Sequence, residues 1–288
     1  MDLAFAVFLQ VATGVATLLI ISLGLAVIFG MMRVINLAHG EFLMLGAYSA
    51  IISVRAGANI WVAMLVIAPI VVGVVGAVVE RVLIRGLYGR VLDTMLATWG
   101  LSLALIGAVT MIFGDSVSGF SAPLGSIVIG GYRSSSYGLF LIGAAVVLLC
   151  GTWAVLRGTR VGLIARGTMQ DAEMAAALGV SPRRVYAATF TAGAAISGLA
   201  GALIAPFSGV VPTMGTLYIA RAFITVLTGG TAMLAGTVSA SALLGTVSTL
   251  GTYFTTPVLG EVIMLVLAVL LLRLLPQGIT GRFFRRAL

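Results

Sequence analysis

The chain has 288 residues, of which 61% are hydrophobic and 8% are charged, and its mean hydropathy is +1.21. These values exclude a soluble globular domain and indicate an integral membrane protein that crosses the bilayer several times. The net charge is +8 and all 16 basic residues are arginine, so the chain offers no lysine for a P-loop ATPase or for a Schiff base.

The predicted membrane segments follow one another along the whole chain. In order, the apolar runs are 4–32, 37–54, 60–79, 92–113, 137–156, 185–205, 222–235, 237–254 and 257–275. We therefore predict an all-α protein: a polytopic transmembrane helical bundle of about eight or nine segments in a single domain, residues 1–288. The run 222–235 is short and contains Gly229 and Gly230, so a re-entrant segment is the alternative there.

The second run begins with a polar stretch that contains Asn36, Glu41 and His39, the only histidine of the chain. Since residues 42–54 number only 13 and a crossing needs ~20, the membrane segment includes this stretch. A polar, glycine-containing break at membrane depth is tolerated only where it is buried in protein or lines a cavity.

We therefore predict a discontinuous helix near 36–41. Ionisable groups at this depth indicate function, so the polar side chains either line a substrate path or hold the break by hydrogen bonds. An unpaired charge would be costly there, which predicts an ion pair between Glu41 and an arginine of a neighbouring segment. A lone histidine beside an asparagine and a glutamate does not make a convincing metal site, and no metal is predicted.

The fourth run contains Thr98, Trp99 and Ser102. Two hydroxyl groups beside an indole suit contact with a small polar solute. The alternative is hydrogen bonding between helices, which is common for such residues in membranes.

Residues 157–184 form the longest polar stretch. Thr168 and Asp171 have the spacing of a capping box, and Gly179 is a natural residue after a helix end, so we predict a short helix over 170–178. A helix this short is marginal in water and needs a surface to pack on. That surface is either its own subunit or a cytoplasmic ATPase.

The arginines predict the orientation. They cluster between the third and fourth runs, between the fifth and sixth, and in the tail at Arg282, Arg285 and Arg286. The positive-inside rule places these clusters in the cytoplasm, which puts the N-terminus and the loops 114–136 and 206–221 outside. A cytoplasmic tail then requires 222–235 to cross, giving nine crossings. Because the basic residues lie in such loops, the charge does not indicate binding to nucleic acid.

Four sets of residues carry a resemblance to a known family: 34–41 with 44–48, 80–81 with 87–90 and 97–102, 162–179, and 227–230 with 234–237 and 275–278. Together they resemble the permease subunits of ABC importers of the branched-chain amino acid and urea type. Within that family, the stretches 92–100, 173–180 and 257–261 lean toward the urea or short-chain amide branch.

The resemblance implies a multi-pass permease of the bacterial plasma (inner) membrane, surrounded by membrane lipid, that forms the path for urea or a short-chain amide. A branched-chain amino acid permease of the same family is the alternative. The implied partners are a second homologous permease chain, two cytoplasmic ATPase subunits and an extracytoplasmic solute-binding protein. Because the ATPases supply the hydrolysis, the chain itself is expected to be neither an enzyme nor a cofactor protein.

Two groups of site residues follow from the residues and the resemblance together. The expected substrate-path residues are Asn36, His39, Glu41, Thr98, Trp99, Ser102, Gly229 and Gly230. The expected ATPase-coupling residues are Arg166, Asp171, Glu173, Met174, Leu178 and Gly179.

Two other classes of function have less support from the sequence. A stand-alone secondary transporter or channel lacks the acidic relay that its predicted segments would need. A membrane enzyme lacks a nucleophile set, a metal cluster or a carboxylate pair, and a single histidine leaves little for general-base chemistry. Co-purification of an ATPase would separate the importer from both.

Overall fold

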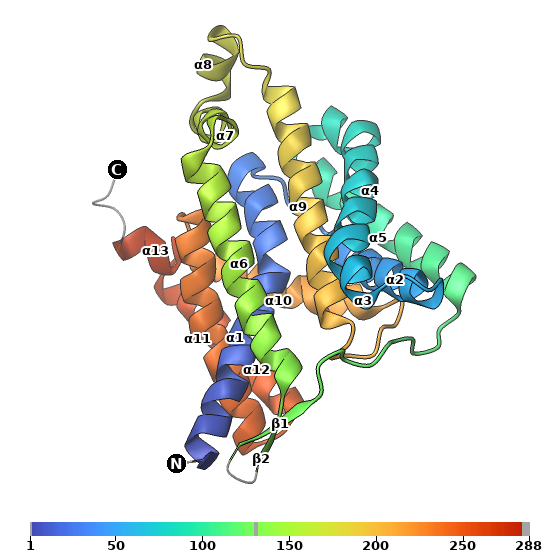
Figure 1. Ribbon diagram of the computed structural model, residues 1–288. Coiled ribbons are helices and arrows are strands. Elements are labelled where there is room, and N and C mark those ends of the chain that lie inside the picture. The colour runs from blue at the N-terminus through green and yellow to red at the C-terminus, as the bar shows by residue number, and fades with distance from the viewer. Residues whose placement is uncertain (1, 130–131, 284–288) are drawn as a thin grey trace. The chain divides into compact units, whose positions relative to one another are not determined.

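The computed structural model describes residues 2–129 and 132–283, and this part of the chain is almost entirely helical (Figure 1). The all-α prediction is confirmed, with one addition in the predicted external loop 114–136. There, β1 (Ser126–Ile129) and β2 (Tyr132–Ser135) pair as an antiparallel hairpin. The last arginines of the predicted tail, Arg285 and Arg286, lie outside the described residues.

Among the described residues, seven helical runs are long and apolar enough to cross a membrane, judged by length and composition. Six of them contain one long helix each: α1 (Asp2–Met32), α5 (Val91–Phe113), α6 (Ser136–Gly158), α9 (Pro182–Ile204), α11 (Met233–Phe254) and α12 (Pro257–Leu274). The seventh joins α3 (Ile60–Val62), the π-helix η1 (Ala63–Ile67) and α4 (Ala68–Val82).

Two further helices are shorter. α2 (His39–Arg55) has 17 residues and α10 (Met214–Gly229) has 16, fewer than the ~20 that a full crossing needs. The polytopic helical bundle is thus confirmed, whereas the choice between eight and nine crossings stays a prediction.

The bounds predicted for the run 222–235 are wrong. α10 begins at Met214, inside the stretch 206–221 that the sequence predicted as a loop, and it ends at Gly229. Gly230 has a φ of +85°, a left-handed conformation that glycine adopts without strain and that commonly ends a helix. The glycine pair therefore separates α10 from α11 and does not interrupt one segment. The charge of Arg221 made the first turns of α10 read as a loop.

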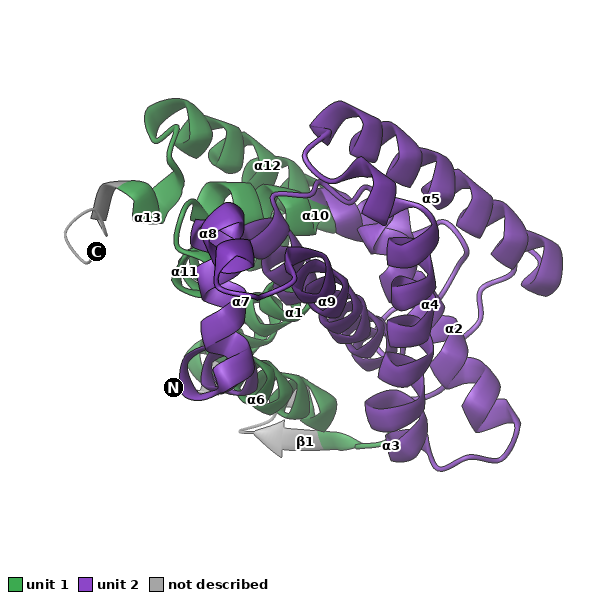
Figure 2. Ribbon diagram, turned by 90° about the horizontal axis from the view of Figure 1, so that it is seen from above, with its two compact units in different colours: residues 1–22, 122–149, 221–288 green, residues 23–121, 150–220 purple. Residues whose placement is uncertain are grey.

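The described chain forms two compact units, each assembled from several segments (Figure 2). The first unit comprises 1–22, 122–149 and 221–288, and in it α11 packs against α12 and α13 (Gly278–Phe283). A Cβ added to Gly245 of α11 would lie 2.8 Å from the Cα of Val15, so α1 and α11 approach closely there. The single-domain assignment stays a prediction.

The second unit comprises 23–121 and 150–220, and α9 is its central helix, packed mainly against α4 and α2. Glycines make this possible: a Cβ at Gly198 would collide with Val72 of α4, and one at Gly201 with the backbone of Leu43 of α2. The fully buried rings of Phe42 and Phe190 meet edge to face at 6.0 Å. This packing places the beginning of α2 inside the protein.

Two loops that the sequence predicted on the same side are also joined. Ser118, after α5, and Val210, before α10, exchange two backbone hydrogen bonds of 2.9 and 2.8 Å. Both residues belong to the second unit.

Candidate functional site

The chain breaks its helical path between α1 and α2. α1 ends at Met32 and α2 begins at His39, so the predicted discontinuity is confirmed and lies at 33–38, slightly before the expected position. Among the described residues other than glycine, Arg33 alone has a positive φ, of 52°. This uncommon conformation turns the chain at the beginning of the break.

Buried hydrogen bonds hold the break in place. Asn36 accepts the backbone N–H of Ala38 through Oδ1 at 3.0 Å, and Thr98 of α5 accepts the N–H of Leu37 through Oγ1 at 3.1 Å. The side chains of Asn36 and Thr98 are fully buried. Since the first N–H groups of a helix have no partner within it, these two side chains satisfy donors at the point where the helix is interrupted.

His39 ties the start of α2 to α9. Its imidazole is fully buried, and Nδ1 lies 3.2 Å from Oγ of Ser197. The Ser197 hydroxyl also lies 2.8 Å from the carbonyl oxygen of Gly193. Because that hydroxyl has only one hydrogen, the arrangement favours Nδ1 of His39 as the donor of the longer contact.

Glu41 is buried in the first turn of α2, with 1% of its surface exposed. The predicted ion pair with an arginine is wrong, because Glu41 forms none among the described residues. Neither carboxylate oxygen meets the geometry of a hydrogen bond with a described residue, although the Ser102 hydroxyl of α5 lies close by. A buried carboxylate without a cation is costly, which marks Glu41 as the unusual group of this site.

The start of α10 meets the start of α2 at this carboxylate. A Cβ at Gly215 would lie 2.8 Å from Oε1 of Glu41, and a Cβ at Gly40 would collide with the backbone carbonyl of Gly215. The N-terminal ends of two helices thus approach Glu41, and the partial positive charge at a helix N-terminus stabilises a nearby anion. The cluster formed by Asn36, His39, Glu41, Thr98 and Ser102 is called the break cluster below.

Trp99 does not belong to the break cluster. Thr98 and Ser102 lie one turn apart on the buried face of α5, whereas Trp99 points away from that face with 56% of its surface exposed. The structure therefore separates the indole from the hydroxyl pair that the sequence placed beside it.

Gly229 and Gly230 lie in the first unit, where they form a helix joint. Thr280 of α13 donates its hydroxyl hydrogen to the carbonyl oxygen of Gly229 at 2.6 Å and accepts the N–H of Ala232 at 3.1 Å. A Cβ at Gly230 would lie 2.9 Å from the Cα of Gly278. These contacts give the glycine pair a structural explanation within its own unit.

An ion pair that the sequence did not indicate lies in the first unit. Arg221 of α10 and Glu261 of α12 contact each other, and both side chains are only partly exposed. Arg221 ends the stretch 206–221 that the sequence predicted as a loop, and the sequence does not reveal which helices are neighbours.

The expected coupling residues lie on two helices, α7 (Arg160–Gln170) and α8 (Ala172–Ala177), and in the turn after them. The predicted capping box is wrong: Thr168 is buried inside α7, and Asp171 is the N-cap of α8, where it accepts the N–H groups of Glu173 and Met174. The reason is that α7 continues through the polar stretch and α8 starts anew after it.

The end of α8 matches the prediction. Gly179 has a φ of +84° and donates its N–H to Ala176, while Val180 donates to Ala175, which is the hydrogen-bond pattern of a Schellman motif. Met174 and Leu178 expose 58% and 78% of their surfaces. Arg166 lies on α7, where its Nε donates to the carbonyl of Gly162 at 3.4 Å.

Sequence reasoning missed Ser197, Gly215 and the fact that the close approach of α10 leaves no space for a side chain at Gly40. Ser197 lies in a run of small residues that reads only as a packing face, and Gly215 lies where the sequence predicted a loop. Among the described residues, no group of three or more histidine, cysteine, aspartate or glutamate side chains is placed to bind a metal.

The chain is similar to known proteins over nearly its full length. The sequence model of the family described as "Branched-chain amino acid transport system / permease component" matches residues 7–272. The high-affinity branched-chain amino acid transport system permease protein LivH of Escherichia coli (strain K12) is 28% identical over 283 residues, which cover 93% of this chain and 92% of LivH.

Two further relatives have corresponding names. BraD of Pseudomonas aeruginosa, also a high-affinity branched-chain amino acid transport system permease protein, is 29% identical over 286 residues, covering 93% of this chain and 92% of BraD. The probable branched-chain amino acid transport permease protein LivH of Methanocaldococcus jannaschii is 25% identical over 284 residues, covering 92% and 88%. None of these names supports the expected lean toward urea or short-chain amides.

Proposed function

The chain belongs to the family described as the permease component of branched-chain amino acid transport systems, and from that premise we propose that it forms the translocation path for branched-chain amino acids in an ABC importer. The observation that carries the proposal is the family match over residues 7–272, together with relatives of that name aligned over nearly their whole length. The branched-chain alternative thus has better support than the urea reading that the sequence favoured.

The chemistry of the break cluster supports an amino acid as the solute. A branched-chain amino acid carries an ammonium group, a carboxylate and an apolar side chain, whereas urea is neutral. Glu41 offers a buried negative charge that no described basic residue neutralises, and a substrate ammonium is a fitting counter-ion. In this proposal Asn36, His39, Thr98 and Ser102 shape the path around Glu41.

The partners belong to the same proposal. A chain without lysine has no P-loop of its own, so two cytoplasmic ATPase subunits supply the hydrolysis, and a second homologous permease chain completes the pore. A solute-binding protein delivers the substrate on the outer face of the bacterial plasma membrane. The exposed apolar side chains of Met174 on the locally capped α8 and of Leu178 directly after it support this segment as the ATPase docking element.

The proposed mechanism is alternating access. Closure of the ATPases on ATP displaces α7 and α8, and α9 carries this displacement to the helices around the break at 33–38. Orientation, with the N-terminus outside and the C-terminus in the cytoplasm, rests on the distribution of arginine in the loops.

The test is uptake by proteoliposomes that contain this chain with its co-encoded permease, ATPases and binding protein. We expect ATP-dependent uptake of labelled leucine and none of labelled urea, and no uptake when the ATPase carries a Walker A lysine substitution. Urea uptake without leucine uptake would overturn the substrate, and leucine uptake independent of ATP would overturn the importer.

A further inference from the structure

A second buried carboxylate lies near the end of α4, in the second unit, at the connection to α5. Glu80 is 3% exposed, and Tyr88 donates its hydroxyl hydrogen to Oε1 of Glu80 at 2.5 Å. Nε of Arg85, in the 3₁₀ helix η2 (Ile84–Leu87), lies 4.0 Å from the same oxygen, an ion-pair distance that is too long for a hydrogen bond. Among the described residues, Tyr88 is therefore the one close hydrogen-bond donor to Glu80.

The phenol of Tyr88 must be protonated to donate its hydrogen bond to Glu80. Burial, and next the hydrogen bond to Glu80, raises the pKa of Tyr88 well above its usual range. The group is therefore protonated at neutral pH and acts as a donor, and the carboxylate acts as the acceptor.

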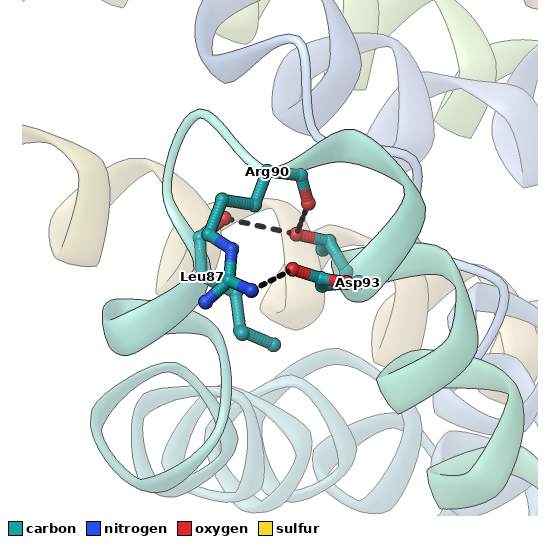
Figure 3. A network of polar contacts seen from close by, with 4 residues as sticks. Leu87, Arg90 and Asp93 are labelled. Carbon is teal, nitrogen blue, oxygen red and sulfur yellow. Dashed lines mark hydrogen bonds and ion pairs between the residues drawn. The ribbon is translucent and has the colours of Figure 1, made fainter.

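The connection that carries Tyr88 is held together by its own polar contacts (Figure 3). Oγ1 of Thr94 lies 3.1 Å from the carbonyl oxygen of Leu87 and 2.8 Å from that of Arg90, and Arg90 forms an ion pair of 2.5 Å with Asp93. These contacts close the loop between α4 and α5 against the first turn of α5, so the backbone at Tyr88 has a defined position.

The ring of Tyr88 also contacts α9. It packs against Tyr186 with a centroid separation of 5.1 Å and an interplanar angle of 63°, a favourable edge-to-face arrangement. Tyr186 is the fifth residue of α9 and lies nine positions after the end of α8 at Ala177, and both α7 and α8 contact α9. Figure 1 shows α8 beyond the first turn of α9, with α7 between α8 and the end of α6.

The contact between the tyrosines differs from the rest of the α4–α9 packing. Further along, Gly73 and Gly76 of α4 face Ala195 and Ala194 of α9, and this close apolar packing holds the two helices by steric fit, without a polar contact between these residues. The ring contact and the hydrogen bond to Glu80 are directional, so they add a directional constraint at this end of the two helices.

We propose that Tyr88 is a positioning residue that couples the docking helices to the membrane helices, through the sequence Tyr186, Tyr88 and Glu80. The inference rests on the proposed function, because it requires an ATPase that displaces α7 and α8. A displacement of the first turns of α9 reaches α4 through the Glu80 carboxylate and reaches α5 through the closed loop.

The test measures substrate transported per ATP hydrolysed in the reconstituted importer. Tyr88→Phe keeps the ring and removes the bond to Glu80, and Tyr186→Leu removes the ring contact. For each we expect a loss of about fivefold in transport per ATP, the effect of one hydrogen bond or ring pair, with ATPase activity retained. Tyr186→Phe, which keeps the ring, and Arg81→Gln, which changes an exposed neighbour on α4, serve as matched controls and should couple normally.

The outcomes separate this inference from the proposed function. If the unmodified importer shows no ATP-dependent uptake, the proposed function fails. If it couples and both Tyr88→Phe and Tyr186→Leu also couple normally, the inference alone fails. A lower yield or unfolding temperature of the variants with unchanged transport per ATP equally overturns it, because that result describes a purely structural contact.

Discussion

The two helices on which the proposed function depends begin in opposite ways. α2 begins at His39 without a side-chain N-cap of its own, and its first three residues are buried. α8 begins after Asp171, which is exposed and caps the helix by accepting two hydrogen bonds from the backbone N–H groups two and three positions further along. The start of α2 depends on distant segments in addition to the nearby Asn36, whereas the start of α8 depends on its immediate neighbours.

The difference matches the environment of each segment. Inside a membrane protein no water is available to satisfy the free N–H groups of a helix end, so Thr98 on α5 supplies an acceptor for the break and Ser197 on α9 contacts His39. At an exposed surface, a local cap suffices. Substitutions in the break cluster should therefore affect the whole fold or the transport step, whereas substitutions in α8 should affect docking.

The largest effect is expected from Gly40→Ala. The added Cβ would collide with the backbone of Gly215, which has no flexible side chain to move aside, so we expect destabilisation by about 3 kcal/mol or more. Thermal unfolding of the purified protein and the yield of inserted protein measure it. Gly100→Ala on α5, where a Cβ meets open space, is the matched control, and equal stability of the two variants would contradict the close approach of α2 and α10.

Glu41→Gln should separate transport from stability. Removing the charge takes away the proposed counter-ion of the substrate ammonium, and we expect leucine uptake to fall roughly 10- to 100-fold, the worth of a charge-assisted hydrogen bond. The unfolding temperature should stay the same or rise, because a neutral amide is less costly to bury than a carboxylate. Glu41→Asp keeps the charge and should retain more uptake. Normal uptake by the glutamine variant would remove Glu41 from the path.

Thr98→Val tests whether α5 holds the break. Valine has the shape of threonine but cannot accept the N–H of Leu37, and leaving that donor unsatisfied should cost about 1–3 kcal/mol. Thr98→Ser keeps the hydroxyl and is the control. The comparison of their unfolding temperatures decides the point, and a valine variant as stable as the serine variant would exclude this hydrogen bond as a support of the break.

The smallest effect on stability is expected from Asp171→Ala. Loss of the N-cap should destabilise α8 by about 1 kcal/mol without changing the unfolding of the membrane helices, and it should reduce ATP-driven uptake. Asp171→Asn, which can also cap, should behave like the unmodified chain. Hydrogen exchange at the amides of Glu173 and Met174 reports the cap directly.

A stronger change at the same place tests the docking element itself. Asp171→Arg combined with Glu173→Arg should uncouple ATP hydrolysis from leucine uptake while the chain still inserts into the membrane. Unchanged uptake in this double variant would exclude α8 as the coupling segment.

The sequence by itself determined the helical class, most of the membrane segments, the break before α2 and the end of α8 at Gly179. These features depend on properties that neighbouring residues carry: an apolar run of sufficient length, a polar interruption at membrane depth, and a glycine after a helix end. The same local reasoning misplaced α10 and the cap of α8. The charge of Arg221 indicated a loop where α10 is helical, and the spacing of Thr168 and Asp171 indicated a helix start inside α7.

Only the tertiary structure decided what surrounds Glu41 and His39. Ser197, which contacts His39, is 158 positions away along the chain, and Thr98, which accepts the Leu37 N–H, is 61 positions away. The tertiary structure also places Trp99 on a different face of α5 from Thr98, and it brings Arg221 into contact with Glu261. The physical reason is that hydropathy and helix capping depend on adjacent residues, whereas contacts between helices depend on which helix faces meet and at which residues. A small residue such as Gly215 does not indicate its neighbour in the sequence, because its role depends on the helix that packs against it.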